Sequence, residues 1–379
     1  MMEIPAELLA EFPERDNLVF FDHAAVSPIS RRAKKQMLEF MEKISSPAKI
    51  NIPEFAEQVE KARSQCAALI NADPGSVCFV RSTSHGISLV ASGLKWRTGD
   101  NIVTYNREFP ANIYPWMNLI KKGIELRMVR ERDGKIMVED IEKLINSRTR
   151  LVAVSLVQFT NGFRIDLNAL GQLCRQKNVL LLVDAIQGLG IIPFNLQETP
   201  VDFLAADGHK WLLSPEGLGI FYIKPALLNQ LDLSIIGWNS VQNPQEYLNY
   251  RLELRPDARR FEEGSYNNLS IIGLGASVSL LLDAGVDKLF ARSLEIISLL
   301  AEEMGKMGAK ILSPMEPENR SAILSVAPAN QDLKAVYRKL RERGVVCSVR
   351  AGALRLSPHG YQDIADAEKF LAAWKEAAL

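Results

Sequence analysis

The sequence has no excess of either charge and few cysteines. Its 45 Lys and Arg residues balance 45 Asp and Glu residues, so the formal net charge is +0, and no basic stripe stands out. Nucleic-acid binding depends on such a stripe and is therefore not expected. The cysteines form no CxxC pair, so we expect no zinc or redox site and favour buried, reduced thiols. They are Cys66, Cys78, Cys174 and Cys347.

Long apolar runs and leader-like segments are also lacking. The most apolar windows, such as "VLLLVDAIQGLGIIPF", are interrupted by Asp184 and Gln187 and are too short to cross a bilayer. The N-terminus is acidic and broken by prolines, unlike a secretory signal. We therefore expect a soluble, cytoplasmic protein with no membrane partner.

Two common phosphate-binding motifs are absent. No GxxxxGK[ST] segment occurs, which excludes a P-loop. The segment "GLGIIP" at 188–193 has Pro193 where a dinucleotide-binding loop needs its third glycine, so we expect no Rossmann-type nucleotide site.

The chain does contain a regular alternation of apolar and amphipathic segments. With 379 residues it is long enough for two domains. Strand-like runs at 77–81, 101–105, 151–157 and 179–185 alternate with helix-like segments, and each run is continuously apolar. Such strands are typical of a parallel sheet covered on both faces. The pattern predicts an α/β fold in which residues 20–284 form a large domain with a mostly parallel central sheet.

The rest of the chain is predicted to form smaller units. Beyond Gly264 the pattern changes, and a long amphipathic helix at 287–308 is followed by short strands and a closing helix. We therefore expect a small C-terminal α+β domain over 285–379, with Gly285 at the boundary. Residues 1–19 are expected to form an N-terminal segment that packs with this small domain.

Three polar features follow apolar strands. "RSTSHG" (81–86) opens a helix whose N–H groups could bind an anion, or whose hydroxyls could simply cap it. Asp184 ends "LLLVDA", where ligands bind in open α/β sheets, but it could equally cap the next helix. Lys210 follows "VDFLAADGH". A partly desolvated lysine is a good amine nucleophile, although a single lysine usually reaches solvent.

Together the three features match the needs of pyridoxal 5'-phosphate. Its phosphate suits a helix N-terminus, its pyridine nitrogen needs a carboxylate, and its aldehyde needs a lysine amine for a Schiff base. Since all three features are expected at the carboxyl edge of one sheet, Asp184 and Lys210 can reach one ring.

The chain resembles fold-type I pyridoxal-phosphate enzymes of the class V aminotransferase group, which includes cysteine desulfurases, isopenicillin-N-epimerase-like proteins and kynureninases. The resemblance runs from "FFDHAAVSPIS" (20–30) through "RSTSHGISLVA", "REFPANIYPW", "VQFTNGFRIDL", "VDAIQGLG" and "ADGHKWLLSPEGLGIFY" to "LRLSPHGY". It implies the fold-type I architecture, with a large domain whose mostly parallel sheet is covered by helices and a small C-terminal α+β domain.

The resemblance also implies roles for individual residues around the cofactor. Lys210 would form the Schiff base and later move the α-proton of the substrate. Asp184 would pair with the pyridinium nitrogen, and Gln187 would hydrogen-bond the ring hydroxyl. Thr83, Ser84 and His209 match residues that bind the phosphate. Ser265 matches a position that reaches the phosphate of the neighbouring subunit, which implies a homodimer with shared active sites.

On the substrate side, the resemblance implies that Arg355 grips an α-carboxylate, for which its planar fork is suited. His23 could line the pocket near its entrance or serve as a structural turn residue. Phe109 stands where desulfurases have a histidine on the cofactor ring. It would stack on that ring but could not act as an acid or base.

Departures from the desulfurases shape the expected activity. Only "AGAL" separates Arg350 from Arg355, so the mobile loop cysteine of desulfurases is missing, and Cys347 is expected in a core strand. Asp207 stands where it would repel the phosphate, so its side chain is expected to turn toward loop amides. With no residue for sulfur capture, we favour an aminotransferase acting on an amino-acid-like substrate. The alternatives are a C–S β-elimination lyase or desulfurase-like enzyme, an epimerase, and a catalytically silent pyridoxal-phosphate-binding protein.

Overall fold

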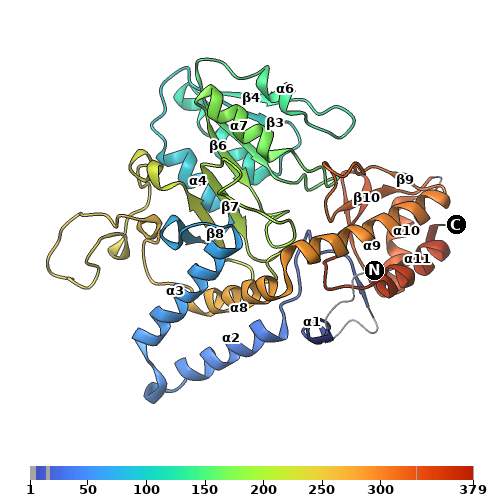
Figure 1. Ribbon diagram of the computed structural model, residues 1–379, viewed down its shortest axis with the longest axis horizontal. Coiled ribbons are helices and arrows are strands. Elements are labelled where there is room, and N and C mark those ends of the chain that lie inside the picture. The colour runs from blue at the N-terminus through green and yellow to red at the C-terminus, as the bar shows by residue number, and fades with distance from the viewer. Residues whose placement is uncertain (1–5, 14–17, 330, 379) are drawn as a thin grey trace.

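The computed structural model describes residues 6–13, 18–329 and 331–378. Within them, a large unit is built around one seven-stranded sheet, and a smaller unit lies at the right of Figure 1. The strands of the large sheet lie in the order β2–β8–β7–β6–β5–β3–β4. Their bounds are β2 (Val77–Val80), β3 (Asn101–Tyr105), β4 (Glu125–Val129), β5 (Thr149–Ser155), β6 (Leu180–Asp184), β7 (Phe203–Asp207) and β8 (Gly219–Ile223).

Strand β8 runs against its neighbours in this sheet. Strands β3 to β7 pair in parallel, while β8 pairs antiparallel with both β7 and β2. Strand β2 therefore points the same way as β7, and the carboxyl ends of β2 to β7 meet at one edge. The predicted mostly parallel sheet is confirmed.

Alternate residues of these strands face two apolar cores. Val152 and Val154 pack in the core that includes side chains of α3, α7 and α8, whereas Leu151 and Ala153 pack in the core that includes α4. Because both faces are covered, the inner strands have no side that faces solvent, which explains their continuous apolar sequences. The edge strand β4 is more exposed and contains Glu125 and Arg127. The helices of the large unit are α2 (Arg31–Ile44), α3 (Ile52–Leu69), α4 (Thr83–Gly93), α5 (Tyr114–Met117), α6 (Val138–Glu142), α7 (Leu167–Lys177) and α8 (Asn268–Ala284).

Side-chain caps fix where two of these helices begin. The Ser82 hydroxyl accepts a hydrogen bond from the His85 N–H (3.1 Å) at the start of α4. Asp166 accepts one from the Ala169 N–H (2.9 Å) at the start of α7, and that helix ends at Asn178 in the left-handed conformation (φ 54°). Such caps satisfy backbone groups that the helix itself leaves unpaired, so short polar residues define the helix boundaries.

The small unit has a core of its own. This core joins Val19 and Phe21 to residues from Ile296 onward, and strand β1 pairs in parallel with β11. The four-stranded sheet has the order β12–β13–β10–β9. The elements are β1 (Val19–Phe20), α9 (Val286–Lys306), β9 (Lys310–Ile311), β10 (Leu324–Ala327), α10 (Leu333–Glu342), β11 (Val345–Val346), β12 (Ser348–Arg350), β13 (Ala353–Leu356) and α11 (Ile364–Ala378).

The chain bends sharply where the sequence places the domain boundary. Helices α8 and α9 meet at Gly285 (φ 80°) with an angle of 78° between them. Among the described residues, no single helix is long and apolar enough to cross a membrane. Helices α8 and α9 reach the necessary length and apolar composition only when taken together, as this bent pair.

Part of the predicted N-terminal segment can be placed. Helix α1 (Ala6–Ala10) is followed by Phe12, whose ring stacks on Tyr361 with centroids 3.8 Å apart. Residues 1–5 and 14–17 of this segment lie outside the described residues.

Candidate active site

Polar side chains from neighbouring strands meet at the carboxyl edge of the large sheet. Strand β5 ends at Ser155, β6 at Asp184 and β7 at Asp207. Ser155 pairs with Asp184 across the two strands, and Asp184 pairs in turn with Ala205 on β7. The residues just before each of these ends are apolar and buried, so the polar side chains of the three strand ends lie together at this edge.

Lys210 lies in the turn that follows β7 and is buried, with 9% of its surface exposed. Burial lowers the pKa of its ammonium group to about 8, against the opposing effect of the Asp184 carboxylate. Its Nζ lies 5.6 Å from the centre of the Phe109 ring. A lysine in this state is partly neutral near pH 8 and can act as a nucleophile or a base.

Asp184 is buried with its carboxylate only half satisfied. Oδ1 accepts a hydrogen bond from the Ile186 N–H (3.1 Å), whereas Oδ2 has no hydrogen-bond partner among the described residues. Burial raises the pKa of this carboxyl to about 6, although the Ile186 N–H and the charge of Lys210 oppose the rise. The free oxygen is available to a donor such as a protonated ring nitrogen.

Helix α4 presents its N-terminus to the same edge. Thr83 Oγ1 accepts a hydrogen bond from the Asp207 N–H (2.9 Å), which ties the helix start to β7, and Ser84 is exposed. Gly86 lets the helix approach β7, because a Cβ there would stand 2.9 Å from the Cβ of Ala205. The N–H groups and partial positive charge of this helix end suit an anion.

Asp207 and His209 form a pair directly before Lys210. Nδ1 of His209 lies 3.0 Å from Oδ1 of Asp207, although neither atom makes a hydrogen bond of good geometry with the described residues. The prediction that Asp207 turns toward loop amides is therefore wrong, since its carboxylate faces the imidazole.

Gln187 is anchored within the protein. Its Nε2 donates to the Ala24 carbonyl (3.0 Å), and its Oε1 accepts from the indole N–H of Trp211 (3.1 Å). The amide nitrogen keeps a second N–H that could donate to a ring hydroxyl, as the resemblance implies.

His23 belongs to a buried cluster of rings beneath Lys210's neighbour Trp211. Its ring nitrogens lie 3.0 Å from the Ser357 carbonyl oxygen and 2.8 Å from the Tyr361 hydroxyl. Burial lowers the pKa of His23 well below its ordinary value, and the nearby His359, also buried, adds to this effect. Both nitrogens are occupied by protein groups, so the predicted substrate contact gives way to a structural role between the two units.

Arg355 reaches the site from strand β13 and is buried. Nη1 donates to the Phe159 carbonyl (2.9 Å), and Nη2 lies 3.5 Å from Oδ1 of Asp22. Burial lowers the pKa of the guanidinium to about 10, and Asp22 opposes this. Nε and Nη2, which share one edge of the guanidinium, have no hydrogen-bond partner among the described residues. That edge could bind a carboxylate with two parallel bonds.

Two further predicted residues lie at the surface. Phe109 is 44% exposed and meets the ring of Phe159 edge-on, with centroids 5.3 Å apart. Ser265 is exposed in the segment that leads into α8. Phe109 is thus brought to Lys210, whereas no hydrogen bond or ion pair among the described residues joins Ser265 to the site.

Sequence reasoning missed two buried residues at this edge. Glu108 accepts hydrogen bonds from the Ser155 N–H (2.6 Å) and from the Ser155 hydroxyl. Gln158 is buried, and neither atom of its amide has a hydrogen-bond partner among the described residues. A signal existed in both cases, because each is a polar residue beside a strand-end motif already singled out, "REFPAN" and "VQFTNGF".

Several buried polar atoms at this edge lack a hydrogen-bond partner within the described part of the chain. They are Oδ2 of Asp184, Oδ1 of Asp207, Nδ1 of His209, both amide atoms of Gln158, and Nε and Nη2 of Arg355. Buried polar atoms are normally hydrogen-bonded, so this group of atoms indicates a polar ligand. Pyridoxal phosphate with an amino-acid substrate fits these residues, since it brings a ring nitrogen, a phosphate and a carboxylate to the same edge.

Comparison with known proteins agrees with this fit. A family model described as Aminotransferase class-V matches residues 19–359. A probable cysteine desulfurase of Pyrococcus abyssi is 26% identical over 396 aligned residues, which cover 99% of this chain and 98% of the relative.

Two solved structures share the fold. The apo structure of a cysteine desulfurase from Thermococcus onnurineus superposes with a TM-score of 0.91 at 24% identity, covering 100% of this chain and 99% of that one. The cystine C–S lyase C-DES, in complex with its product cysteine persulfide, gives a TM-score of 0.89 at 20% identity over 97% of this chain and 100% of that one. The predicted fold-type I architecture is confirmed.

Proposed function

This chain belongs to the aminotransferase class-V family, and from that premise we propose that it is a pyridoxal-phosphate-dependent lyase that cleaves the C–S bond of a cysteine-like amino acid by β-elimination. Pyridoxal phosphate is the cofactor of this family, as expected from the strand-end features. The names of the similar proteins, which are cysteine desulfurases and a cystine C–S lyase, support a sulfur-bearing substrate. The sequence alone favours transamination. The names of these relatives instead support cleavage of a C–S bond.

The residues of the site divide the task of holding the cofactor. When bound, pyridoxal phosphate supplies an electron-withdrawing ring that makes the α-proton of the substrate acidic. Lys210 would bond to its aldehyde, Asp184 would hydrogen-bond its ring nitrogen, and Phe109 would cover one face of its ring. The N-terminus of α4 and His209 would bind its phosphate.

Two buried basic residues would bind the substrate and transfer its proton. Arg355 would bind the α-carboxylate through Nε and Nη2. Lys210, displaced by the substrate amine, would take the α-proton, since burial lowers its pKa to about 8 and keeps part of the amine neutral. The bond between Cβ and sulfur then breaks with both electrons on sulfur, which leaves as sulfide from cysteine or as cysteine persulfide from cystine. The remaining three-carbon unit takes up water and leaves as pyruvate and ammonia, so no oxidant or reductant is needed.

The observation that favours release of the sulfur over its capture is the burial of every cysteine in the chain. All four thiols are buried, and burial raises the pKa of Cys347 to about 12. Strands β12 and β13 are joined by a two-residue turn at Ala351 (φ 48°) and Gly352 (φ 79°), so no thiol-bearing loop extends from this hairpin. Capture of sulfur by an enzyme needs a reactive thiolate. Release of the sulfur from the site therefore suits this chain better than capture.

Product analysis with purified, cofactor-loaded protein tests the proposal. With cysteine or cystine, we expect pyruvate and ammonia in equal amounts, together with sulfide or persulfide in solution. Cys347→Ser should leave the rate unchanged, because that thiol is buried. Three results would overturn the proposal: a keto acid that retains its sulfur, which indicates transamination; a D-amino acid, which indicates epimerisation; or a persulfide carried on Cys347.

We also propose that the enzyme is a homodimer that shares its active sites. The segment between β8 and α8 extends away from the body of the protein, in yellow at the left of Figure 1. It exposes Tyr247, Leu248, Tyr250 and Leu252, of which Leu248 and Tyr250 are 88% and 89% exposed. Apolar surface of this kind indicates a protein contact. Sedimentation should give a dimer, and Leu248→Asp should weaken it; a monomeric wild type would contradict this.

A further inference from the structure

Glu108 is a buried acid that the proposed reaction does not use. It follows β3 and precedes Phe109, and only 7% of its surface is exposed. Its Oε1 accepts a hydrogen bond from the Ser155 N–H (2.6 Å), and its Oε2 is hydrogen-bonded to the Ser155 hydroxyl. Both carboxyl oxygens of Glu108 are therefore hydrogen-bonded to a single residue, Ser155, at the end of β5.

Ser155 is at the same time fixed to Asp184. It is the last residue of β5 and lies opposite Asp184 in the parallel pairing of β5 with β6. The next residue, Leu156, donates its N–H to the Asp184 carbonyl (2.9 Å). The Tyr105 hydroxyl also donates to the Ser155 carbonyl (2.8 Å), which holds β3 against this strand end.

Glu108 thus connects two residues expected to contact the cofactor ring, Phe109 at one face and Asp184 at the ring nitrogen. Phe109 follows it directly and faces Lys210 Nζ, while Asp184 carries the free carboxylate oxygen. A chain of contacts runs from Phe109 through Glu108 and Ser155 to Asp184. If the first link is lost, the Phe109 segment can move away from the sheet edge.

The state of Glu108 also suits its position. Burial raises the pKa of this carboxyl to about 8, and the nearby charge of Asp184 raises it further, against the hydrogen bonds from Ser155. A neutral Glu108 at pH 7 adds no second negative charge beside Asp184. In the structure the Ser155 hydroxyl donates to Oε2, and the Ser155 N–H donates to Oε1. Because a hydroxyl can also accept a hydrogen bond, a protonated Glu108 can keep both contacts with Ser155 without carrying a charge.

We propose that Glu108 is a positioning residue, whose bonds to Ser155 set the separation between the Phe109 ring and the Asp184 carboxylate and so fix the slot for the pyridine ring of pyridoxal phosphate. This inference rests on the proposed function, because it assumes that the cofactor binds at this edge. It assigns Glu108 no part in proton transfer.

Cofactor binding to the apo-protein tests the proposal without relying on turnover. The readouts are the Kd for pyridoxal phosphate, from a spectral titration, and the visible circular dichroism of the bound cofactor. Glu108→Ala should raise the Kd on the order of 10-fold and weaken the dichroic band, because both bonds to Ser155 are lost. Ser155→Ala, which removes only the hydroxyl bond, should have a smaller effect of the same sign.

The conservative variant separates positioning from charge. Glu108→Gln should bind the cofactor within about 3-fold of the wild type, because an amide can accept the Ser155 N–H and donate to the Ser155 hydroxyl just as a neutral acid does. A matched control lies at the other end of the same strand, where the buried Thr149 hydroxyl donates to Oδ1 of Asn101 (2.7 Å). Thr149→Ala should lower the melting temperature but leave the Kd and the dichroic band unchanged.

The outcomes distinguish the positioning role of Glu108 from the proposed function on which it rests. Wild-type binding of pyridoxal phosphate with an unchanged Kd in Glu108→Ala would overturn the positioning role alone. Equal effects of Glu108→Ala and Thr149→Ala on the Kd would also overturn it, because loss of stability would then explain both. A wild type that binds no pyridoxal phosphate would overturn the proposed function as well. If Glu108→Ala does not fold, the Kd values of Glu108→Gln and Ser155→Ala decide the question.

Discussion

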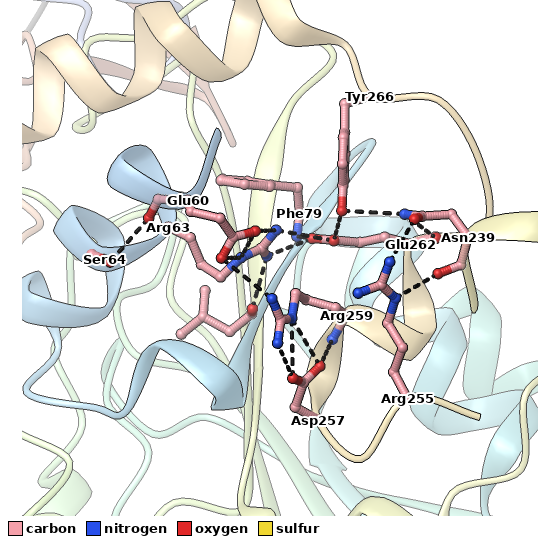
Figure 2. Close-up of polar contacts among 11 residues, drawn as sticks. Glu60, Arg63, Ser64, Phe79, Asn239, Arg255, Asp257, Arg259, Glu262 and Tyr266 are labelled. Carbon is pink, nitrogen blue, oxygen red and sulfur yellow. Dashed lines mark hydrogen bonds and ion pairs between the residues drawn. The ribbon is translucent and has the colours of Figure 1, made fainter. Parts of the chain in front are cut away.

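Two buried polar regions of the large unit, the Arg63–Glu262 network and the active-site edge, satisfy their polar atoms to different degrees. In the network, Arg63 donates to both oxygens of Glu262, at 2.6 and 3.0 Å, and Glu262 also accepts from the Tyr266 hydroxyl and the Phe79 N–H (Figure 2). Burial alone would lower the pKa of Arg63, but the facing carboxylate raises it above its ordinary value. Arg63 and Glu262 therefore each have an oppositely charged partner in the same chain.

At the active-site edge the same degree of burial has the opposite electrostatic result. The pKa of Lys210 is lowered to about 8 and that of Asp184 is raised to about 6, chiefly because burial disfavours both charges. Neither group has the bidentate partner that Glu262 provides for Arg63. The difference indicates that the network holds the fold, whereas the edge keeps its polar atoms for a ligand.

Loss of Lys210 should have the largest effect on function and little on the fold. We expect Lys210→Ala to lower the rate of pyruvate release by at least about 10³-fold, because its amine supplies the proton transfer. The absorbance band of the covalently held cofactor should disappear. Lys224, an exposed lysine paired with Asp202, is the matched control, and Lys224→Ala should keep full activity. Normal turnover by Lys210→Ala would contradict the site assignment.

Loss of Arg63 should have the reverse effect, with a large cost in stability and none in chemistry. Arg63→Ala leaves Glu262 buried without its ion pair, which should lower the free energy of unfolding by about 3–5 kcal/mol in a urea titration. Arg259 belongs to the same network in Figure 2 but is 34% exposed where it pairs with Asp257. Arg259→Ala should therefore cost less than about 1 kcal/mol. Equal losses for the two variants would remove the distinction between buried and exposed pairs.

Arg355 combines features of both regions, since it has one hydrogen bond and one ion pair within the protein, while its Nε and Nη2 lack a hydrogen-bond partner among the described residues. Arg355→Gln should raise KM for cysteine by roughly 10- to 100-fold, because charge-assisted hydrogen bonds to the α-carboxylate are lost. Steady-state kinetics measures this effect. Cysteamine, which lacks the carboxylate, should bind to the variant and the wild type with similar affinity. A larger loss of binding for cysteamine than for cysteine would contradict the assignment.

The sequence predicted the features that depend on local order along the chain. Continuous apolar strands ending in Asp184 and in the turn before Lys210 define the sheet and its edge, because strand direction alone places such ends together. The helix start at Thr83 and the break at Gly285 also follow from neighbouring residues.

Features that depend on distant contacts were not predictable in this way. Glu108 grips a serine 47 residues away, and Arg63 pairs with a glutamate 199 residues away. No periodicity or motif reports such partners, since they follow from how the strands are ordered in the sheet. The side chain of Asp207 is a similar case, because its approach to His209 depends on the turn geometry after β7.

The smallest effect expected for a residue of the site is a change in the pH dependence of apo-protein stability when Asp184 is replaced. Its pKa is raised from 3.8 to about 6 on folding, so the unfolded chain loses this proton first as pH increases. The buried charge therefore destabilises the apo-protein increasingly from about pH 4 to pH 6, and by a constant amount above pH 6. Asp184→Asn should remove this penalty and stabilise the apo-protein by about 1–2 kcal/mol at pH 7. This is less than the full shift implies, because the variant also loses the carboxylate that favours the charged form of Lys210.

Urea titrations at pH 4 and pH 7 should show the gain in stability of Asp184→Asn shrinking toward zero at the lower pH. A gain that is independent of pH would show that Asp184 is already neutral or paired, and the contrast with Glu262 would then fail.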